Sequence, residues 1–286
     1  MKPSNTETNP FLAMWDEVEA ASPPPTSGNK ITTLDYSDFA EIVWGSDSVA
    51  MRQLVETIYQ GGVYILKGAF SETYCNDVIE NTYNLWGKSE SSFHKMYDGC
   101  PDFHRIIDHE ITKAYSITAI KHAYYFFPWN DDPIDLFESV NSVWRVYKFL
   151  GGYPARSYET NIPSDGVIDR IQIVQYPIGA GELRRHTDPT KNQRVVIGAM
   201  LSKRGVDFDT GGFYVYDNQN REMDIEAYLD TGDMLCCYPT VHHGVNIVDE
   251  AKSLDWETMA GRWYLGLYSN DSDHVRDRVT GSRVEA

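Results

Sequence analysis

The chain has 286 residues, 42% of them hydrophobic, and a formal net charge of −17. This is enough apolar material for a large packed core, and the acidity argues against a nucleic-acid partner, because phosphates would be repelled. No run of about eighteen apolar residues predicts a membrane span, and the polar residues 1–10 do not resemble a secretory signal.

The four cysteines have neither metal-binding nor redox spacing. They are Cys75, Cys100, Cys236 and Cys237. Adjacent cysteines rarely bridge each other, so we expect four reduced thiols and a cytoplasmic protein.

The first half of the chain predicts a helical support. Residues 1–30 have the composition of a leader of low order, although the apolar side chains within 11–15 can pin a short helix onto the body. Apolar spacing and turn residues predict strands at 31–36 and 63–66 and helices at 48–60, 71–86 and 136–150. For 88–132 we expect helix pieces and loops. The aromatic run at 124–129 is either core packing or a wall of the substrate site.

From residue 170 the pattern changes to short strands separated by turns rich in glycine and aspartate. These strands are expected at 170–176, 194–201, 212–216, 233–238, 245–248 and 261–268. A helical part followed by such strands indicates an α+β fold with a β-sandwich or barrel as its core. We therefore expect a single domain at 31–286: mainly helical support at 31–160, a β core at 161–270 and a tail at 271–286.

One motif in this core has the residue types of a metal site. His186 and Asp188 are two residues apart, so on an extended strand both side chains leave the same face. A second imidazole from a later strand, His242 or His243, would complete a 2-His-1-carboxylate triad, which leaves part of a ferrous ion open. Arg262 falls on the inward face of the last strand, where a buried guanidinium needs an anionic partner such as a ligand carboxylate.

The order of these signals resembles the Fe(II)- and 2-oxoglutarate-dependent oxygenases, in particular their prolyl-hydroxylase-like branch. The resemblance covers about 171–268 and rests on six pieces in order: Gln175-Tyr176-Pro177, His186-Thr187-Asp188, Gly211-Gly212, Gly232-Asp233, His243-Gly244-Val245 and Arg262-Trp263-Tyr264. It implies a double-stranded β-helix (jelly-roll, cupin-like) core with N-terminal and intervening helices packed on it.

The resemblance also implies roles for individual residues. His186, Asp188 and His243 would ligate Fe(II), with His243 preferred over His242 because the family pattern is His-x-Val. Arg262 would pair with the C5 carboxylate of 2-oxoglutarate, with Tyr176 as a second contact and Gln172 as a weaker candidate. Two features depart from the family: the interval from His243 to Arg262 is long, and Ala199-Met200 stands where that branch often has a tyrosine.

The implied activity is a dioxygenase that uses O2 and 2-oxoglutarate to oxidise an unactivated C–H bond. Asp188 favours hydroxylation over halogenation, while desaturation and ring formation stay open. We expect a small-molecule substrate, such as an amino-acid derivative or a natural-product intermediate, and Arg184 and His104 are candidate substrate contacts. The alternatives are a hydroxylase of protein or peptide side chains, and a cupin-type metal-binding or sensing protein that does not use 2-oxoglutarate.

Overall fold

The computed structural model describes residues 9–87 and 89–284. Its α-helices are α1 (Pro10–Ala21), α2 (Tyr36–Trp44), α3 (Ser48–Tyr59), α4 (Glu72–Thr82) and α5 (Leu136–Leu150). The strands of the first half are β1 (Lys30–Asp35), β2 (Gly62–Lys67), β3 (Phe103–Ile107) and β4 (Ala119–Phe126). Those of the second half are β5 (Val167–Pro177), β6 (Glu182–Thr187), β7 (Val196–Met200), β8 (Gly212–Tyr216), β9 (Glu222–Asp224), β10 (Met234–Cys237), β11 (His243–Asn246), β12 (Gly261–Asp271) and β13 (Ser282–Arg283).

The strands form two sheets that β4 joins. One sheet has the order β1-β2-β10-β7-β12-β5-β4, and the other continues from β4 through β6-β11-β8-β9. The first residues of β4 pair with β6, whereas 122–126 pair with β5, so this strand passes from one sheet into the other. The longest pairing joins β5 and β12 over eleven residues of each strand and forms the centre of the first sheet.

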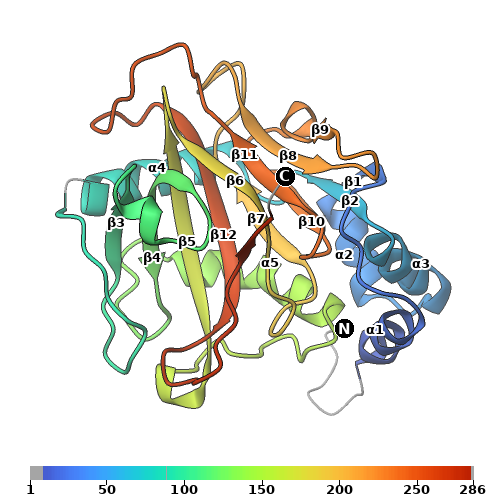
Figure 1. Ribbon diagram of the computed structural model, residues 1–286. Coiled ribbons are helices and arrows are strands. Elements are labelled where there is room, and N and C mark those ends of the chain that lie inside the picture. The colour runs from blue at the N-terminus through green and yellow to red at the C-terminus, as the bar shows by residue number, and fades with distance from the viewer. Residues whose placement is uncertain (1–8, 88, 285–286) are drawn as a thin grey trace.

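The N-terminal helices pack beside the first sheet. Figure 1 shows α1, α2 and α3 gathered at one side of the molecule, next to β1 and β2. Helix α1 begins after Asn9, whose side chain accepts a hydrogen bond from the Phe11 amide, and it buries Phe11, Met14 and Trp15. Within the expected leader 1–30, the apolar side chains of 11–15 thus hold a helix on the body, because they give it a core-facing stripe. Residues 1–8 lie outside the described part of the chain.

The region 88–132 differs from expectation. Besides the expected loops and one short helical piece, the 3-10 helix Ile111–Ala114, it contributes the strands β3 and β4. Strand β4 lies in the interior, with six of its eight side chains buried, so its sequence lacks the regular change between polar and apolar residues that would mark a strand. Tyr124 and Phe127 of the aromatic run are core residues, whereas Tyr125 lines a cavity described below. Helix α2 was not predicted from the sequence either.

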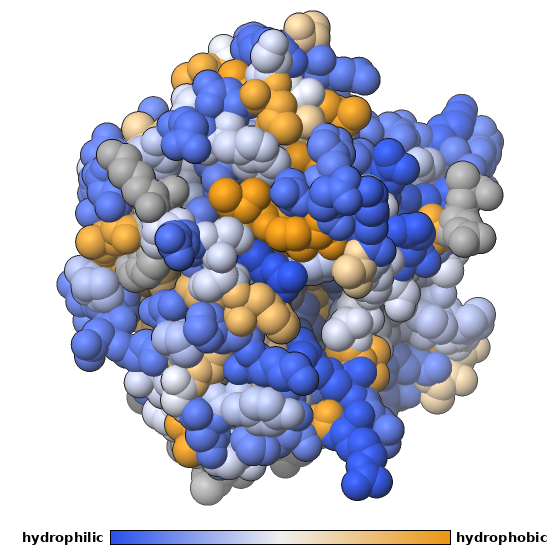
Figure 2. All heavy atoms as spheres, turned by 60° about the vertical axis from the view of Figure 1, so that its left-hand side comes forward, coloured by the Kyte–Doolittle hydropathy of each residue, from blue (hydrophilic) through white to orange (hydrophobic). Residues whose placement is uncertain are grey.

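The face shown in Figure 2 is mainly hydrophilic, with hydrophobic side chains in separate patches. None of the helices within the described residues has the length and hydrophobicity needed to cross a membrane.

Candidate metal centre and adjoining cavities

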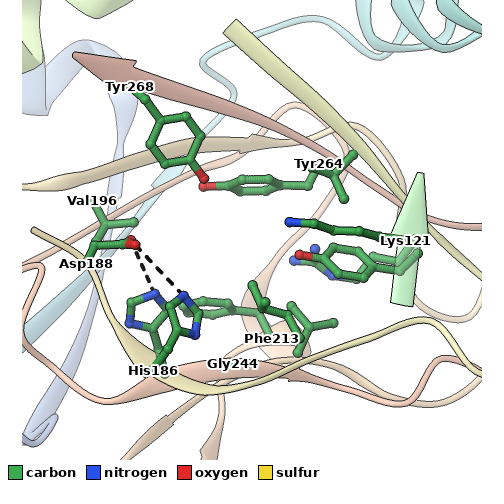
Figure 3. A pocket seen from close by; sticks show the side chains of 14 residues that line it. Lys121, His186, Asp188, Val196, Phe213, Gly244, Tyr264 and Tyr268 are labelled. Atoms are coloured by element: carbon green, nitrogen blue, oxygen red, sulfur yellow. Dashed lines mark ion pairs between the residues drawn. The ribbon is translucent and has the colours of Figure 1, made fainter. Parts of the chain in front are cut away.

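The three expected metal ligands meet between the two sheets. His186 lies on β6, Asp188 follows the end of that strand, and His243 opens β11 directly opposite His186. Their ligand atoms lie within 4.8 Å of one another. The Nε2 atoms of His186 and His243 are 3.9 and 3.5 Å from the Asp188 carboxylate, which faces both imidazoles in Figure 3. The Asp188 amide donates to the Pro239 carbonyl and fixes the backbone there.

Backbone carbonyls set the orientation of both imidazoles. His186 Nδ1 bonds to the Arg184 carbonyl at 2.9 Å, and His243 Nδ1 bonds to the Val241 carbonyl at 2.8 Å. In each case the acceptor lies two residues earlier, so the extended backbone itself supplies it. A carbonyl can only accept, so Nδ1 carries the proton and Nε2 is left as a lone-pair donor. This is the tautomer that a metal ligand requires.

The pKa shifts of His186, Asp188 and His243 favour the binding of a cation by the cluster. Burial, with help from His243, lowers the pKa of His186 to about 3, so its imidazole is neutral at pH 7. Burial opposes ionisation of Asp188, but without a metal a proton on His243 Nε2 supplies a hydrogen bond and a positive charge that outweigh it and lower the pKa of the carboxyl. For His243 burial is likewise outweighed by Asp188, and its pKa rises. The carboxylate thus attracts positive charge, whether a proton or a metal ion.

The neighbouring histidine faces another way. His242 Nδ1 bonds to Arg185 Nη2 at 2.7 Å, and the Arg185 guanidinium stacks on the Tyr216 ring. The geometry therefore groups His243, and not His242, with His186 and Asp188. Strand β11 also begins at His243, two residues before the expected start, because His243 pairs with both His186 and Val215.

A first cavity of about 460 Å³ opens beside the cluster. Tyr176 and Arg262 both line it, as expected, from directly opposed positions on β5 and β12. Arg262 is not free: its Nε donates to Glu226 Oε2 at 2.9 Å, and both side chains are 1% exposed. The same Glu226 oxygen accepts the Phe213 amide. Glu226, which lies in a short 3-10 turn, was missed because nothing in its sequence context distinguishes it.

A second cavity of about 830 Å³ meets the first one at the metal cluster. The two share Lys121, Leu183, Asp188 and Tyr268. Gln172 lines this second cavity and accepts a hydrogen bond from Arg170, so it does not lie with Tyr176 and Arg262. Lys121 is a basic residue that sequence reasoning missed. Its position on the same face as Ala119, Ala123 and Tyr125 becomes visible only once 119–126 is read as a strand.

The two substrate candidates lie away from the cavities. Arg184 has a 65% exposed side chain and pairs with Glu182. His104, on β3, bonds to His122 at 2.8 Å and stacks on Tyr124 inside the protein. Neither residue lines either cavity. Arg184 was a candidate because it has the same strand parity as His186, and His104 because polar residues surround it in the sequence. Neither pattern distinguishes a cavity wall from a packed or exposed face.

The donor set fits a first-row divalent metal such as Fe(II). Two neutral imidazole nitrogens and one carboxylate oxygen are the ligands of the facial triad, and the adjoining cavity leaves one side of the cluster open. A structural zinc site would have four closed ligands, and the group of described residues found here has three.

Comparison with known structures supports the fold. At 14% identity, the crystal structure of a full-length Neurospora crassa protein in complex with alpha-KG and 5-formyluracil matches 85% of this chain and 85% of its own, with a TM-score of 0.51. A Pseudomonas putida prolyl-4-hydroxylase has 12% identity, coverage of 81% and 97%, and a TM-score of 0.49. A Burkholderia pseudomallei 2OG-Fe(II) oxygenase family protein has 13% identity, coverage of 91% and 100%, and a TM-score of 0.45. No protein-family model and no curated protein matches the sequence.

The strand order and the match to the Neurospora structure confirm the expected architecture. The chain is an α+β protein with the double-stranded β-helix fold of 2-oxoglutarate- and Fe(II)-dependent oxygenases. At such low identity the likeness shows the fold, and the function has to be argued from the site itself.

Proposed function

We propose that this protein is an Fe(II)- and 2-oxoglutarate-dependent dioxygenase that oxidises a C–H bond of a small molecule, most simply by hydroxylation. The observation that carries the proposal is the open-sided cluster of His186, Asp188 and His243 beside a cavity that contains a buried arginine. The similar fold of the Neurospora protein, with bound alpha-KG, which is 2-oxoglutarate, supports the same choice.

Separate residues of the site would bind the metal and the cosubstrate. His186, Asp188 and His243 would hold Fe(II), and Arg262 with Tyr176 would hold the C5 carboxylate of 2-oxoglutarate at the far end of the first cavity. With Fe(II) bound, the site would supply oxidative decarboxylation of 2-oxoglutarate to succinate and CO2, in which one oxygen atom of O2 enters succinate and the other is available to hydroxylate the substrate. Glu226 holds Arg262 in place through its Nε, so the guanidinium is oriented before the cosubstrate arrives.

Apolar side chains keep water away from the reacting centre. Val174, Leu183, Val196 and Phe213 line the first cavity with the polar groups. An apolar lining strengthens the interaction between Arg262 and a carboxylate, because it excludes competing water. It also protects a reactive site from side reactions with solvent.

A small-molecule substrate is supported by the second cavity. This cavity reaches the metal cluster at Asp188, and Arg278, Thr280 and Gly281 of the tail line it together with residues of β4, β5 and β12. The bound 5-formyluracil of the Neurospora protein is a small molecule too. The four free and buried cysteines support a reducing compartment such as the cytoplasm.

The test is succinate release from 2-oxoglutarate with Fe(II) and ascorbate, with and without a metabolite library, together with calorimetric titration of Mn(II) and 2-oxoglutarate. His243→Ala should abolish metal binding, whereas His242→Ala should retain it. Arg262→Leu should weaken 2-oxoglutarate binding far more than metal binding. Metal binding without any affinity for 2-oxoglutarate would instead favour a cupin-type protein, and turnover of peptides alone would reverse the substrate assignment.

A further inference from the structure

The second cavity contains cationic groups that the protein itself does not neutralise. Lys121 and Arg170 both line it, and neither forms an ion pair with a described residue. Most other basic side chains of this acidic chain have a carboxylate partner, including Arg278 at the same cavity, which pairs with Asp273 at 2.7 Å. Asp188 is the one carboxylate among the described residues that line the cavity, and it belongs to the metal cluster.

Arg170 has few hydrogen bonds for its burial. Its Nη2 donates to Gln172 Oε1 at 3.1 Å, while its buried Nε has no partner within the described residues. The guanidinium lies between two aromatic rings, 5.2 Å from the Tyr125 centroid and 5.1 Å from that of Tyr268. Asn270 Nδ2, on another residue of the same lining, also lacks an acceptor. Unmet donors at one place are costly unless a ligand supplies the acceptor.

This cluster is distinct from the candidate cosubstrate site. On the paired strands β5 and β12, Arg262 lies opposite Tyr176 and Arg170 lies opposite Tyr268. The two arginines are therefore six residue pairs apart along the same ladder, roughly 20 Å. Both are on the face that lines the cavities, because Arg170 and Tyr176 have the same parity on β5, as do Arg262 and Tyr268 on β12. Asp188 borders both cavities between these two ends.

We infer that the second cavity binds an acidic small molecule as substrate, with its carboxylate held by Arg170 and its body against Tyr125 and Tyr268. The planar guanidinium of Arg170 offers N–H donors suited to a carboxylate, and it balances one negative charge. Lys121, at the junction of the cavities, adds positive potential toward the metal cluster. The assignment as substrate rests on the proposed function, whereas the binding of an acid does not.

The experiment compares acids with matched neutral molecules. The probes are N-acetyl amino acids and arylalkanoic acids, each paired with its own primary carboxamide and mixed with the metal-free protein. Ligand-observed NMR then measures binding. The acids should bind and their carboxamides should not. Arg170→Met should weaken acid binding by about 10- to 100-fold, and Arg170→Lys by less, because the charge remains while the planar donors are lost.

The matched control is Arg221→Met, since this arginine is 69% exposed and pairs only with Asp217 among the described residues. It should bind the acids like the wild type, and circular dichroism checks the fold of each variant. Equal binding of acids and carboxamides, or failure of every acid to bind, overturns the inference. So does an Arg170→Met variant that loses 2-oxoglutarate affinity as strongly as Arg262→Leu, because the second cavity would then hold the cosubstrate.

The same acids are added to the succinate assay to separate the two proposals. Succinate release stimulated by an acid in the wild type and lost in Arg170→Met supports both. Acid binding that depends on Arg170 without any succinate release keeps the binding site and contradicts the dioxygenase.

Discussion

At the scale of single residues, Arg262 shows how a buried charge can be held ready for a ligand. Burying a guanidinium alone is costly, and Glu226 offsets that cost inside the protein. The pairing uses Nε, while Nη2 lies near the Met200 sulfur, a weak acceptor. The Nε of Arg262 thus has a strong acceptor, whereas its Nη2 has only a weak one. The guanidinium therefore keeps a donor that a ligand carboxylate can bind.

Glu226→Gln is predicted to make the protein depend on 2-oxoglutarate for stability. Without the cosubstrate the free energy of unfolding should fall by up to about 3–5 kcal/mol, because Arg262 becomes a buried and unpaired charge. A bound carboxylate would restore part of this loss. Thermal unfolding with Mn(II), with and without 2-oxoglutarate, should therefore show a larger rise in midpoint for the variant than for the wild type. Glu222→Gln, at an exposed glutamate on β9, is the control, and an equal rise in all three proteins would contradict the proposal.

His104 and His122 form a second buried polar pair, outside the cavities. His104 Nδ1 lies 3.2 Å from the Ser89 carbonyl, and its Nε2 faces His122 Nδ1. Burial lowers the pKa of both, and that of His122 to about 4, with His104 contributing as well. Both imidazoles are therefore neutral at pH 7. This pair belongs to the packing of β3 on β4, which explains why His104 does not reach a ligand.

This pair should make stability depend on pH. The pKa of an unfolded histidine is about 6.5, so between pH 6.5 and about 4 the unfolded chain binds a proton that native His122 does not. Stability from this group is present above pH 6.5 and is lost as the pH falls, by about 1.4 kcal/mol per unit. Urea unfolding of His122→Gln in EDTA should show a shallower decline over this range than the wild type. The exposed His109→Gln should keep the wild-type slope; equal slopes in all three proteins would rule out the His104–His122 pair as the cause.

At the scale of elements, β6 depends on two different segments for its outer edge. Strand β11 pairs with one side, while β4 covers the start of the other side and β13 covers its end, at His186 and Thr187. The strand that carries the first metal ligand is therefore completed by the C-terminal tail. An open edge at that point would leave the backbone of the ligand strand free to move.

Deletion of residues 280–286 should loosen the metal site while leaving the core folded. The amides of 185–187 should exchange faster with deuterium, because the Val284 amide no longer bonds to the Arg185 carbonyl and the β13 pairing is lost. Metal affinity should fall roughly 10-fold, as it does when groups that orient a ligand are removed. Hydrogen exchange and Mn(II) titration measure the two effects. Unchanged protection at 185–187 would show that the tail does not support β6.

At the scale of the whole molecule, the second half of the chain was predicted well from its sequence. Glycine and aspartate turns separate its strands, so the order of the β core and the meeting of His186 and Asp188 with a later histidine followed from the pattern. The family resemblance then selected His243 over His242. The first half was harder to predict, because β4 is buried on both faces and has no alternating polarity. Lys121 was missed with it, and the partnership of Glu226 with Arg262 depends on a turn that no periodicity marks.

The N-terminal helix is the other element whose role appears only in the folded chain. Trp15 is fully buried, donates from Nε1 to the Leu150 carbonyl at 2.6 Å, and packs on the rings of Tyr59 and Tyr238. Helix α1 thereby connects α3, the end of α5 and the residue after β10. Strand β10 pairs with β7, which in turn pairs with β12, the strand of Arg262.

Trp15→Ala should therefore destabilise the whole domain and not only its N-terminus. The expected loss is roughly 3–5 kcal/mol in the free energy of unfolding, as for other fully buried tryptophans. Trp15→Phe keeps most of the packing and should lose about 1 kcal/mol with the hydrogen bond. Leu12→Ala, on the 41% exposed side of the same helix, is the control and should change little. Urea unfolding followed by circular dichroism should give one transition that shifts as a unit. A leader of low order would instead leave Trp15→Ala as stable as the wild type, because an unpacked side chain contributes nothing to the native state.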